Sequence, residues 1–169
     1  MVEMLIYGVS FDLVGKQPIV LLKTADGNKF LPIWIGHPEA AAILMKLQSQ
    51  MPPRPMTHDL LSDVLEQLGA QVVRITVTEL RENTFYAQIT VAQDGGEIEI
   101  DSRPSDAIAL AIRAEAPIFA SDAVIEESAI EFEGEEVDEE QLEAEVSKFR
   151  NFLDEVTPDQ FAVEDGDEE

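Results

Sequence analysis

The stretch Ser102-Arg103-Pro104-Ser105-Asp106-Ala107-Ile108-Ala109-Leu110-Ala111 joins five polar or turn-forming residues to an almost wholly apolar segment. A second junction has the same order: Ile33-Trp34-Ile35-Gly36-His37-Pro38-Glu39 leads into Ala40-Ala41-Ala42-Ile43-Leu44. In each, a proline comes shortly before an acid and an apolar run, which is typical of a helix start. The sequence therefore predicts two related helix starts that carry functional groups, the first leading into a buried helix and the second into an apolar one.

Composition limits the classes of protein that this chain can belong to. Its 169 residues suffice for one compact domain and a tail, and they include no cysteine. Disulfides, thiolate metal sites and cysteine nucleophiles are therefore excluded, and a reducing cytoplasm is expected. The first residues lack the pattern of a signal peptide, and no apolar run approaches the roughly 18 residues of a membrane span. We expect a soluble, cytoplasmic protein with no membrane partner.

The charge is strongly negative and unevenly distributed. The formal net charge is −24, yet residues 1–114 hold nine Lys and Arg against fourteen Asp and Glu, and residues 115–169 hold two against twenty-one. Such a chain repels nucleic acid unless metal ions or a local basic patch reverse the field. The acidic part is interpreted either as a solvated tail or as a surface for a cationic partner.

Apolar patterns predict an α+β fold made of two β-β-β-α units, with an antiparallel or mixed sheet. The expected strands are 5–13, 19–23, 30–35, 73–77, 85–91 and 97–101, and the expected helices are 38–48 and 104–114. A bridging helix begins at Thr57 and ends at Gly69, with Leu60, Leu61, Val64, Leu65 and Leu68 predicted as its inner stripe. The matching order of the two units indicates an internal duplication.

The last part of the chain is predicted to be separate from this unit. A short strand at 118–120 and a helical turn at 123–128 complete a domain of residues 1–130. An acidic helical extension is expected at 131–160, because Leu142, Val146, Phe149 and Leu153 recur on one side from Asp138 onward. Residues 161–169 are too charged to fold and are predicted to be a disordered acidic tail.

Candidate functional residues concentrate at three helix starts. They are His37 and Glu39, then Thr57, His58 and Asp59, then Ser102, Arg103, Ser105 and Asp106. If the two units pack about a pseudo-twofold axis, these starts meet at one cleft, where helix dipoles and Arg103 favour a phosphate. Carboxylates of Glu39, Asp59 and Asp106 are the oxygen ligands that Mg²⁺ or Mn²⁺ prefers.

Simpler interpretations of the same residues remain open. First-turn acids such as Glu39 and Asp59 often only offset the helix dipole and cap amides. Asp106 can form a local ion pair with Arg103, and His58 can complete a cap. A surface position is expected for His37 and core positions for Trp34, Met45 and Phe85.

Three motifs together resemble the bifunctional nuclease domain family. They are Leu31-Pro32-Ile33-Trp34-Ile35-Gly36 with Glu39-Ala40, then Arg54-Pro55-Met56-Thr57-His58-Asp59-Leu60-Leu61, then the stretch from Ser102 to Ala111 with Ala116-Pro117-Ile118. The resemblance covers about residues 4–130 and implies an α+β domain that acts on both DNA and RNA. It points to Glu39, His58, Asp59, Arg103, Ser105 and Asp106 as site residues.

The leading hypothesis is therefore a metal-dependent nuclease that hydrolyses phosphodiester bonds in DNA or RNA. It assigns catalysis to His58, Asp59, Arg103 and Asp106, substrate binding to Arg103, Ser105 and Arg54, and Mg²⁺ or Mn²⁺ to Glu39, Asp59 and Asp106. The alternative is a non-catalytic regulatory domain that binds an anion or a partner protein. A third hypothesis is a structural homo-oligomer in which the motifs build subunit contacts.

Overall fold

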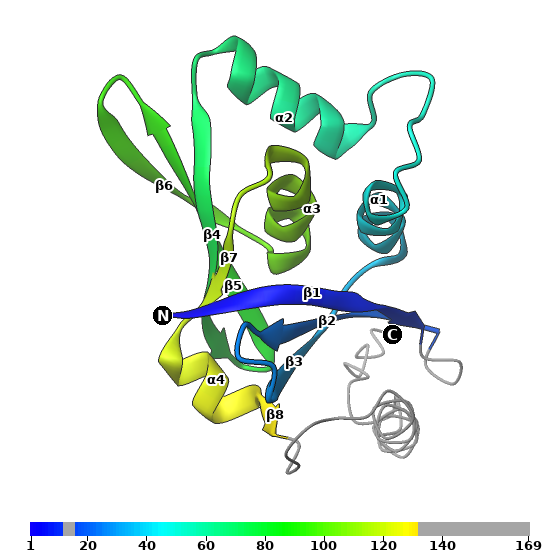
Figure 1. Cartoon of the computed structure of the whole chain (residues 1–169), viewed down its shortest axis with the longest axis vertical. Helices are drawn as coiled ribbons and strands as arrows, with labels where there is room; N and C mark the ends of the chain where they lie inside the picture. Colours follow the sequence, from blue (N-terminus) through cyan, green and yellow to red (C-terminus); the bar gives the residue numbers. More distant parts are fainter. Residues whose placement is uncertain (12–15, 132–169) are drawn as a thin grey trace, which may run out of the picture.

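The computed structural model describes residues 1–11 and 16–131 as one twisted sheet with helices packed against it (Figure 1). The strands are β1 (Val2–Phe11), β2 (Pro18–Thr24), β3 (Lys29–Trp34), β4 (Gln71–Arg81), β5 (Thr84–Gln93), β6 (Gly96–Ser102), β7 (Ile118–Ala120) and β8 (Ile130–Glu131). The helices are α1 (His37–Leu47), α2 (Thr57–Gln67), α3 (Pro104–Ala114) and α4 (Asp122–Ser128). The predicted extension at 131–160 and tail at 161–169 lie almost wholly outside the described residues.

The sheet order is β6-β5-β4-β7-β1-β2-β3-β8. Neighbouring strands are antiparallel except β4 and β7, which are parallel, so the sheet is mixed. The α+β class and the order of two β-β-β-α units with a bridging helix are confirmed. The two three-strand meanders lie on either side of β7, which is the arrangement that a duplication would give, and common descent of the halves stays a prediction.

Tight turns explain the long antiparallel pairs. Between β4 and β5, Glu82 has a φ angle of 50° and Asn83 one of 58°. Between β5 and β6, Asp94 and Gly95 also have positive φ angles. Two consecutive positive φ angles define the type I′ turn, whose twist matches that of paired strands. These turns fix the register of β6, and with it the position of the loop that leads into α3.

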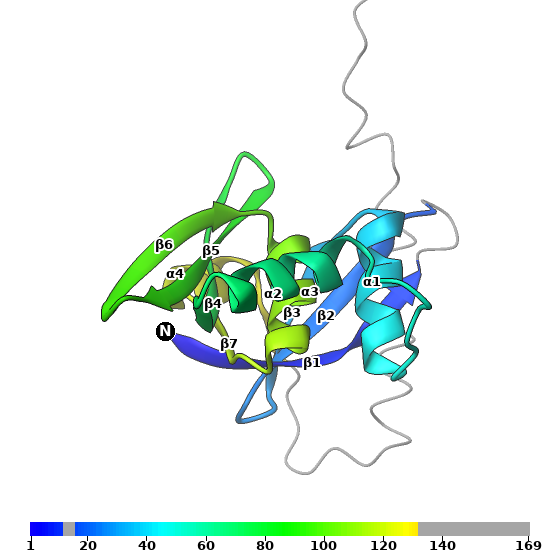
Figure 2. The ribbon, with the colours of Figure 1, turned by 90° about the horizontal axis from the view of Figure 1, so that it is seen from above.

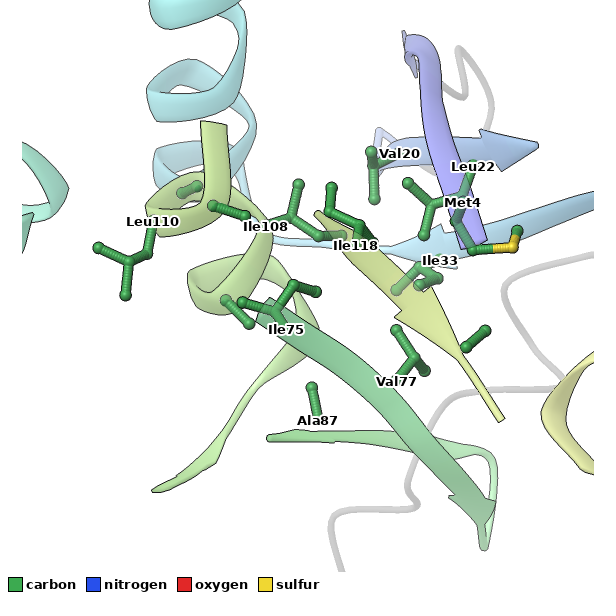
Figure 3. Close-up of a cluster of buried hydrophobic side chains, with 14 of the residues drawn as sticks. Met4, Val20, Leu22, Ile33, Ile75, Val77, Ala87, Ile108, Leu110 and Ile118 are labelled. Atoms are coloured by element: carbon green, nitrogen blue, oxygen red, sulfur yellow. The ribbon is translucent and has the colours of Figure 1, made fainter. Parts of the chain in front are cut away.

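Helix α3 lies at the centre of the helical layer, between α1 and α2, and packs on β4 and β5 (Figures 1 and 2). Small and apolar residues allow this close approach, and five consecutive residues of α3, from Ala107 to Ala111, are fully buried. Figure 3 shows Ile108 of α3 near Ile75 and Ile118, which carry the core into the sheet. The apolar run that follows Asp106 therefore forms the central helix of the domain.

The structure corrects several predicted core positions. The predicted inner stripe of α2 is wrong for four of its five residues, since Leu60, Leu61, Val64 and Leu68 are exposed. Leu65 packs against the core as predicted, and the buried His58 lies on the same inner side. Trp34 is exposed, and Met45 and Phe85 are only partly buried. The period of the apolar residues predicted the helix correctly, but it does not reveal which side of a helix lacks a neighbour.

No described helix reaches the length and apolar character that crossing a bilayer requires.

Strand β8 pairs with β3 through Phe30 and Ile130. The sheet therefore extends one residue beyond the predicted domain end at 130.

Candidate active site

Three acids occupy equivalent positions in three helices. Glu39 is the third residue of α1, Asp59 the third of α2 and Asp106 the third of α3. The amides of a first helical turn lack partners within the helix, and the dipole favours negative charge there. This shared position explains why all three residues are acids. The three differ in the groups to which their carboxylates are hydrogen-bonded.

Arg103 joins two of these acids. It precedes α3 and donates from Nε to Oδ2 of Asp106 at 2.9 Å and from Nη2 to Oε1 of Glu39 at 3.0 Å. Asp106 also accepts, through Oδ1, a hydrogen bond from Nε2 of His58 at 2.9 Å. Residues of α1, α2 and α3 thus form one continuous hydrogen-bonded group, Glu39, His58, Arg103 and Asp106, which we call the Arg103 cluster.

Burial within the Arg103 cluster changes from one end to the other. The His58 side chain is only 10% exposed, whereas the Arg103 side chain is 65% exposed. Glu39 and Asp106 lie between these limits. A molecule arriving from solvent therefore meets the guanidinium first, with the two carboxylates beside it and the imidazole behind them.

Gly36 allows Glu39 to reach this position. It is the residue before α1 and has an extended backbone. A Cβ atom at residue 36 would collide with Oε2 of Glu39. The glycine therefore leaves room for the Glu39 carboxylate to fold back over the helix start toward Arg103, a demand that comes from space rather than from backbone angles.

Hydrogen bonds favour the ionised forms of Asp106 and Arg103. Burial acts to raise the pKa of Asp106, but hydrogen bonds from Arg103 and His58 outweigh it, and the pKa lies below its usual value. Hydrogen bonds to Asp106 and Glu39 raise the pKa of Arg103. Two carboxylates and one guanidinium give these three side chains a formal charge of −1, before His58 is counted.

Asp59 belongs to a different group. Its Oδ1 accepts from Nε of Arg113 at 2.7 Å, and its Oδ2 accepts from the backbone amide of Met56 at 3.0 Å. These bonds, that of Met56 foremost, lower the pKa of Asp59. Arg113 is 7% exposed and also donates to the carbonyl oxygens of Ala42 and Ala109. Asp59 and Arg113 therefore tie α1, α2 and α3 together beneath the surface.

Sequence reasoning missed Arg113. It stands in the last turn of α3, where a basic residue is expected merely to offset the helix dipole. The available signal was a single arginine near the end of a helix that is otherwise apolar. Such a residue must find partners once the helix is buried.

The remaining predicted site residues lie in varied places. Ser105 is buried in the first turn of α3, and Arg54 is exposed on the linker before α2. His37 is exposed at the first residue of α1, as expected, and its ring stacks on Phe11 at 6.5 Å between centroids. The structure brings together Glu39, His58, Arg103 and Asp106, but not Arg54.

A metal site of three or more acid or histidine ligands is not found within the described residues. Glu39 and Asp106 are each hydrogen-bonded to Arg103, and Asp59 is bonded to Arg113. The three carboxylates predicted to share a cation are therefore engaged by two different arginines. In this arrangement the donor set does not fit a common Mg²⁺ or Mn²⁺.

Comparison with known proteins gives a consistent result. The profile of a family described as "Bifunctional nuclease domain" matches residues 20–133. An uncharacterized protein of Mycobacterium tuberculosis is 40% identical over 163 residues, which cover 94% of this chain and 97% of that protein. A protein named bifunctional nuclease 1 from Oryza sativa subsp. indica is 31% identical over 103 residues, and one of that name from Arabidopsis thaliana is 28% identical over 106. These matches cover 59% and 60% of this chain and 31% and 33% of the plant proteins.

Proposed function

Because this chain belongs to the bifunctional nuclease domain family, we propose that its Arg103 cluster binds and hydrolyses phosphodiester bonds of DNA or RNA. One observation supports this proposal above the others. An exposed guanidinium is held by two carboxylates directly in front of a histidine that one of them also binds. Arginine suits phosphate because its planar fork matches two phosphate oxygens.

In this proposal Arg103 contacts the scissile phosphate. Its side chain is largely solvent-exposed, so it can exchange the Glu39 bond for a phosphate oxygen while Nε stays on Asp106. The phosphate would then bind one positive group, with the carboxylates of Asp106 and of the released Glu39 still nearby. Arg54 is exposed on the linker and apart from the cluster, so it is proposed to contact a different phosphate of the same strand.

His58 is proposed to accept the proton of the attacking water. Since Asp106 is ionised and accepts from Nε2, the neutral imidazole carries its lone pair on Nδ1. Nδ1 takes the water proton as the water oxygen bonds to phosphorus and the bond from phosphorus to the leaving oxygen breaks. The leaving oxygen departs on the opposite side of phosphorus and takes its proton from solvent, and the imidazolium, stabilised by Asp106, then releases its proton to solvent.

The predicted Mg²⁺ or Mn²⁺ has no step in this proposal, because the acids that would hold it are bound to arginines.

A cleavage assay tests whether the reaction requires a metal ion. Fluorescent single-stranded RNA and DNA oligonucleotides are incubated with the full chain in EDTA, in Mg²⁺ and in Mn²⁺. Cleavage in EDTA supports the arginine-centred site, and cleavage only with a metal supports the sequence prediction instead.

A matched pair of substitutions tests the site. Asp106→Asn should lower the cleavage rate by about a hundredfold or more, since it removes the charge that orients and stabilises His58. Asp63→Asn makes the same change at an exposed acid on α2 outside the cluster and should leave the rate within about twofold. Equal rates for both variants would contradict the assignment, and an activity that elutes apart from the protein would identify a contaminant.

One observation favours the non-catalytic alternative. His58 is largely buried, and two carboxylates accompany the single guanidinium, both of which suit a fixed structural group. If oligonucleotides bind without being cut, and Arg103→Met abolishes that binding, the domain is a binding module. If neither binding nor cleavage occurs, the nuclease proposal is rejected.

A further inference from the structure

Exposed apolar side chains gather in one part of the surface. Fourteen large apolar residues are exposed in the described part of the chain, and seven of them fall within residues 47–68, at the end of α1, the linker and α2. Isolated exposed apolar residues are ordinary, but a concentration of this kind marks an interaction surface. None of the seven belongs to the Arg103 cluster.

Four of these residues form a continuous line. Met56, Leu60, Val64 and Leu68 follow at intervals of four along α2, so they lie on one side of the helix, and we call them the α2 stripe. The opposite side carries His58 and Leu65, which face the rest of the domain. In Figures 1 and 2, α2 lies at the outside of the helical layer, above α3.

Charge beside the stripe indicates which partner fits it. Asp63 and Glu66 are exposed on α2, and no Lys or Arg occurs between residues 57 and 67. A second copy of this chain would bring the same acids against them, and like charges across an interface are unfavourable. The net charge of −24 adds to that repulsion. A partner with basic residues beside an apolar stripe would instead be complementary.

We propose that the α2 stripe is the docking surface for a basic amphipathic helix of another protein. A ridge of residues spaced by four packs into the matching groove of a partner helix. Lys or Arg beside the apolar line of that helix would then meet Asp63 and Glu66. This inference is independent of nuclease activity, because the stripe shares no residue with the Arg103 cluster.

The probe is an 18-residue synthetic helix of leucine and lysine with its leucines on one side, compared with a counterpart that has glutamate in place of lysine. Binding to the full chain is followed by fluorescence anisotropy. The lysine peptide should bind, and Leu60→Gln should weaken binding about tenfold. Leu5→Gln on β1 is the matched control, since Leu5 is 46% exposed and Leu60 is 56% exposed. That control should bind like the unsubstituted chain.

Three results would overturn the proposal. Equal binding of both peptides removes the charge argument. If Leu60→Gln and Leu5→Gln both bind the lysine peptide like the unsubstituted chain, or both bind it equally weakly, the peptide is attracted to the acidic chain as a whole rather than to α2. Light scattering that finds a dimer, with Leu60→Gln returning it to a monomer, shows that the stripe binds a second copy. Circular dichroism of each variant checks that the fold is retained.

Discussion

Two arginines at the ends of α3 form the same kind of bond in opposite environments. Arg103, just before the helix, bonds the third residue of α1, and Arg113, in the last turn, bonds the third residue of α2. Arg103 is 65% exposed and Arg113 is 7% exposed. The carboxylates do not follow this difference, since Glu39 is 14% exposed and Asp59 is 28% exposed. What differs is the guanidinium: that of Arg103 is accessible to a ligand, and that of Arg113 is enclosed between helices.

The difference in burial sets the energy of each pair. An exposed ion pair contributes roughly 0–1 kcal/mol, because water solvates both partners when they separate. A buried arginine whose carboxylate is removed, or a partly buried carboxylate whose arginine is removed, loses its partner without full solvation. Stability should thus depend on Arg113, and ligand binding on Arg103.

The largest effect expected is from Arg113→Met. It should lower the free energy of unfolding by about 2–3 kcal/mol, because Asp59 and the carbonyls of Ala42 and Ala109 lose their donor in a partly buried setting. Arg103→Met removes a guanidinium that is itself exposed but leaves the largely buried Glu39 carboxylate without its partner, so it should lower the free energy of unfolding by about 1 kcal/mol. Urea denaturation followed by circular dichroism measures both changes.

The comparison fails if the two variants are equally stable. It would also fail if Arg103→Met were the more destabilising, since the cluster would then be the part that holds the helices together. A methionine replacement keeps the length of the apolar stem, so the difference reports the guanidinium rather than lost packing.

Sequence could supply the helix starts but not their partners. The sequence signals of a helix start, such as a proline and an acid before an apolar run, placed Glu39, Asp59 and Asp106 in first helical turns correctly. These signals depend only on residues that are close in the chain. Their bonds to Arg103 or Arg113 connect residues far apart in the chain and depend on how α1, α2 and α3 pack. The assignment of Asp59 to the same site as Asp106 therefore could not be tested from the sequence.

Strand and helix order followed from local patterns, whereas exposure did not. Alternation and turn residues predicted the six strands of the two meanders within a few residues, and the short strand β7 was expected as well. The outward side of α2 was misplaced because a stripe of leucines looks the same whether it faces a core or a partner. Only the packed structure shows that Leu65 faces inward and Leu60 outward.

A smaller effect is expected at the exposed end from Gly36→Ala. The new methyl group would occupy the place of the Glu39 carboxylate, so Glu39 must turn away from Arg103. Because the flexible end of Glu39 can move aside, we expect a loss of less than about 1 kcal/mol in the free energy of unfolding, together with weaker oligonucleotide binding or cleavage. In a Glu39→Ala background the clash is absent, and adding Gly36→Ala should then change stability by less than about 0.5 kcal/mol.

This double-mutant cycle separates space from backbone effects. Gly36 has an extended backbone that alanine adopts readily. If Gly36→Ala is equally destabilising in both backgrounds, Glu39 is not the reason for the glycine. The position of Glu39 in the cluster would then need another explanation.

The smallest effect concerns acid pH. Asp59 and Asp106 both have lowered pKa values when folded, but the largest lowering comes from the Met56 amide for Asp59 and from Arg103 for Asp106. A lowered pKa contributes stability that is fully present above the unfolded value of 3.8 and is lost as pH falls through the folded value. Arg103→Met should therefore bring the pKa of Asp106 back toward 3.8 and reduce the loss of stability in acid, by less than about 1 kcal/mol.

Arg113→Met keeps the Met56 bond, so the pKa of Asp59 should stay lowered. Carboxyl ¹³C NMR titration from about pH 7 to about pH 3 measures both pKa values directly. The comparison would be reversed if the pKa of Asp59 rose more in Arg113→Met than the pKa of Asp106 rises in Arg103→Met.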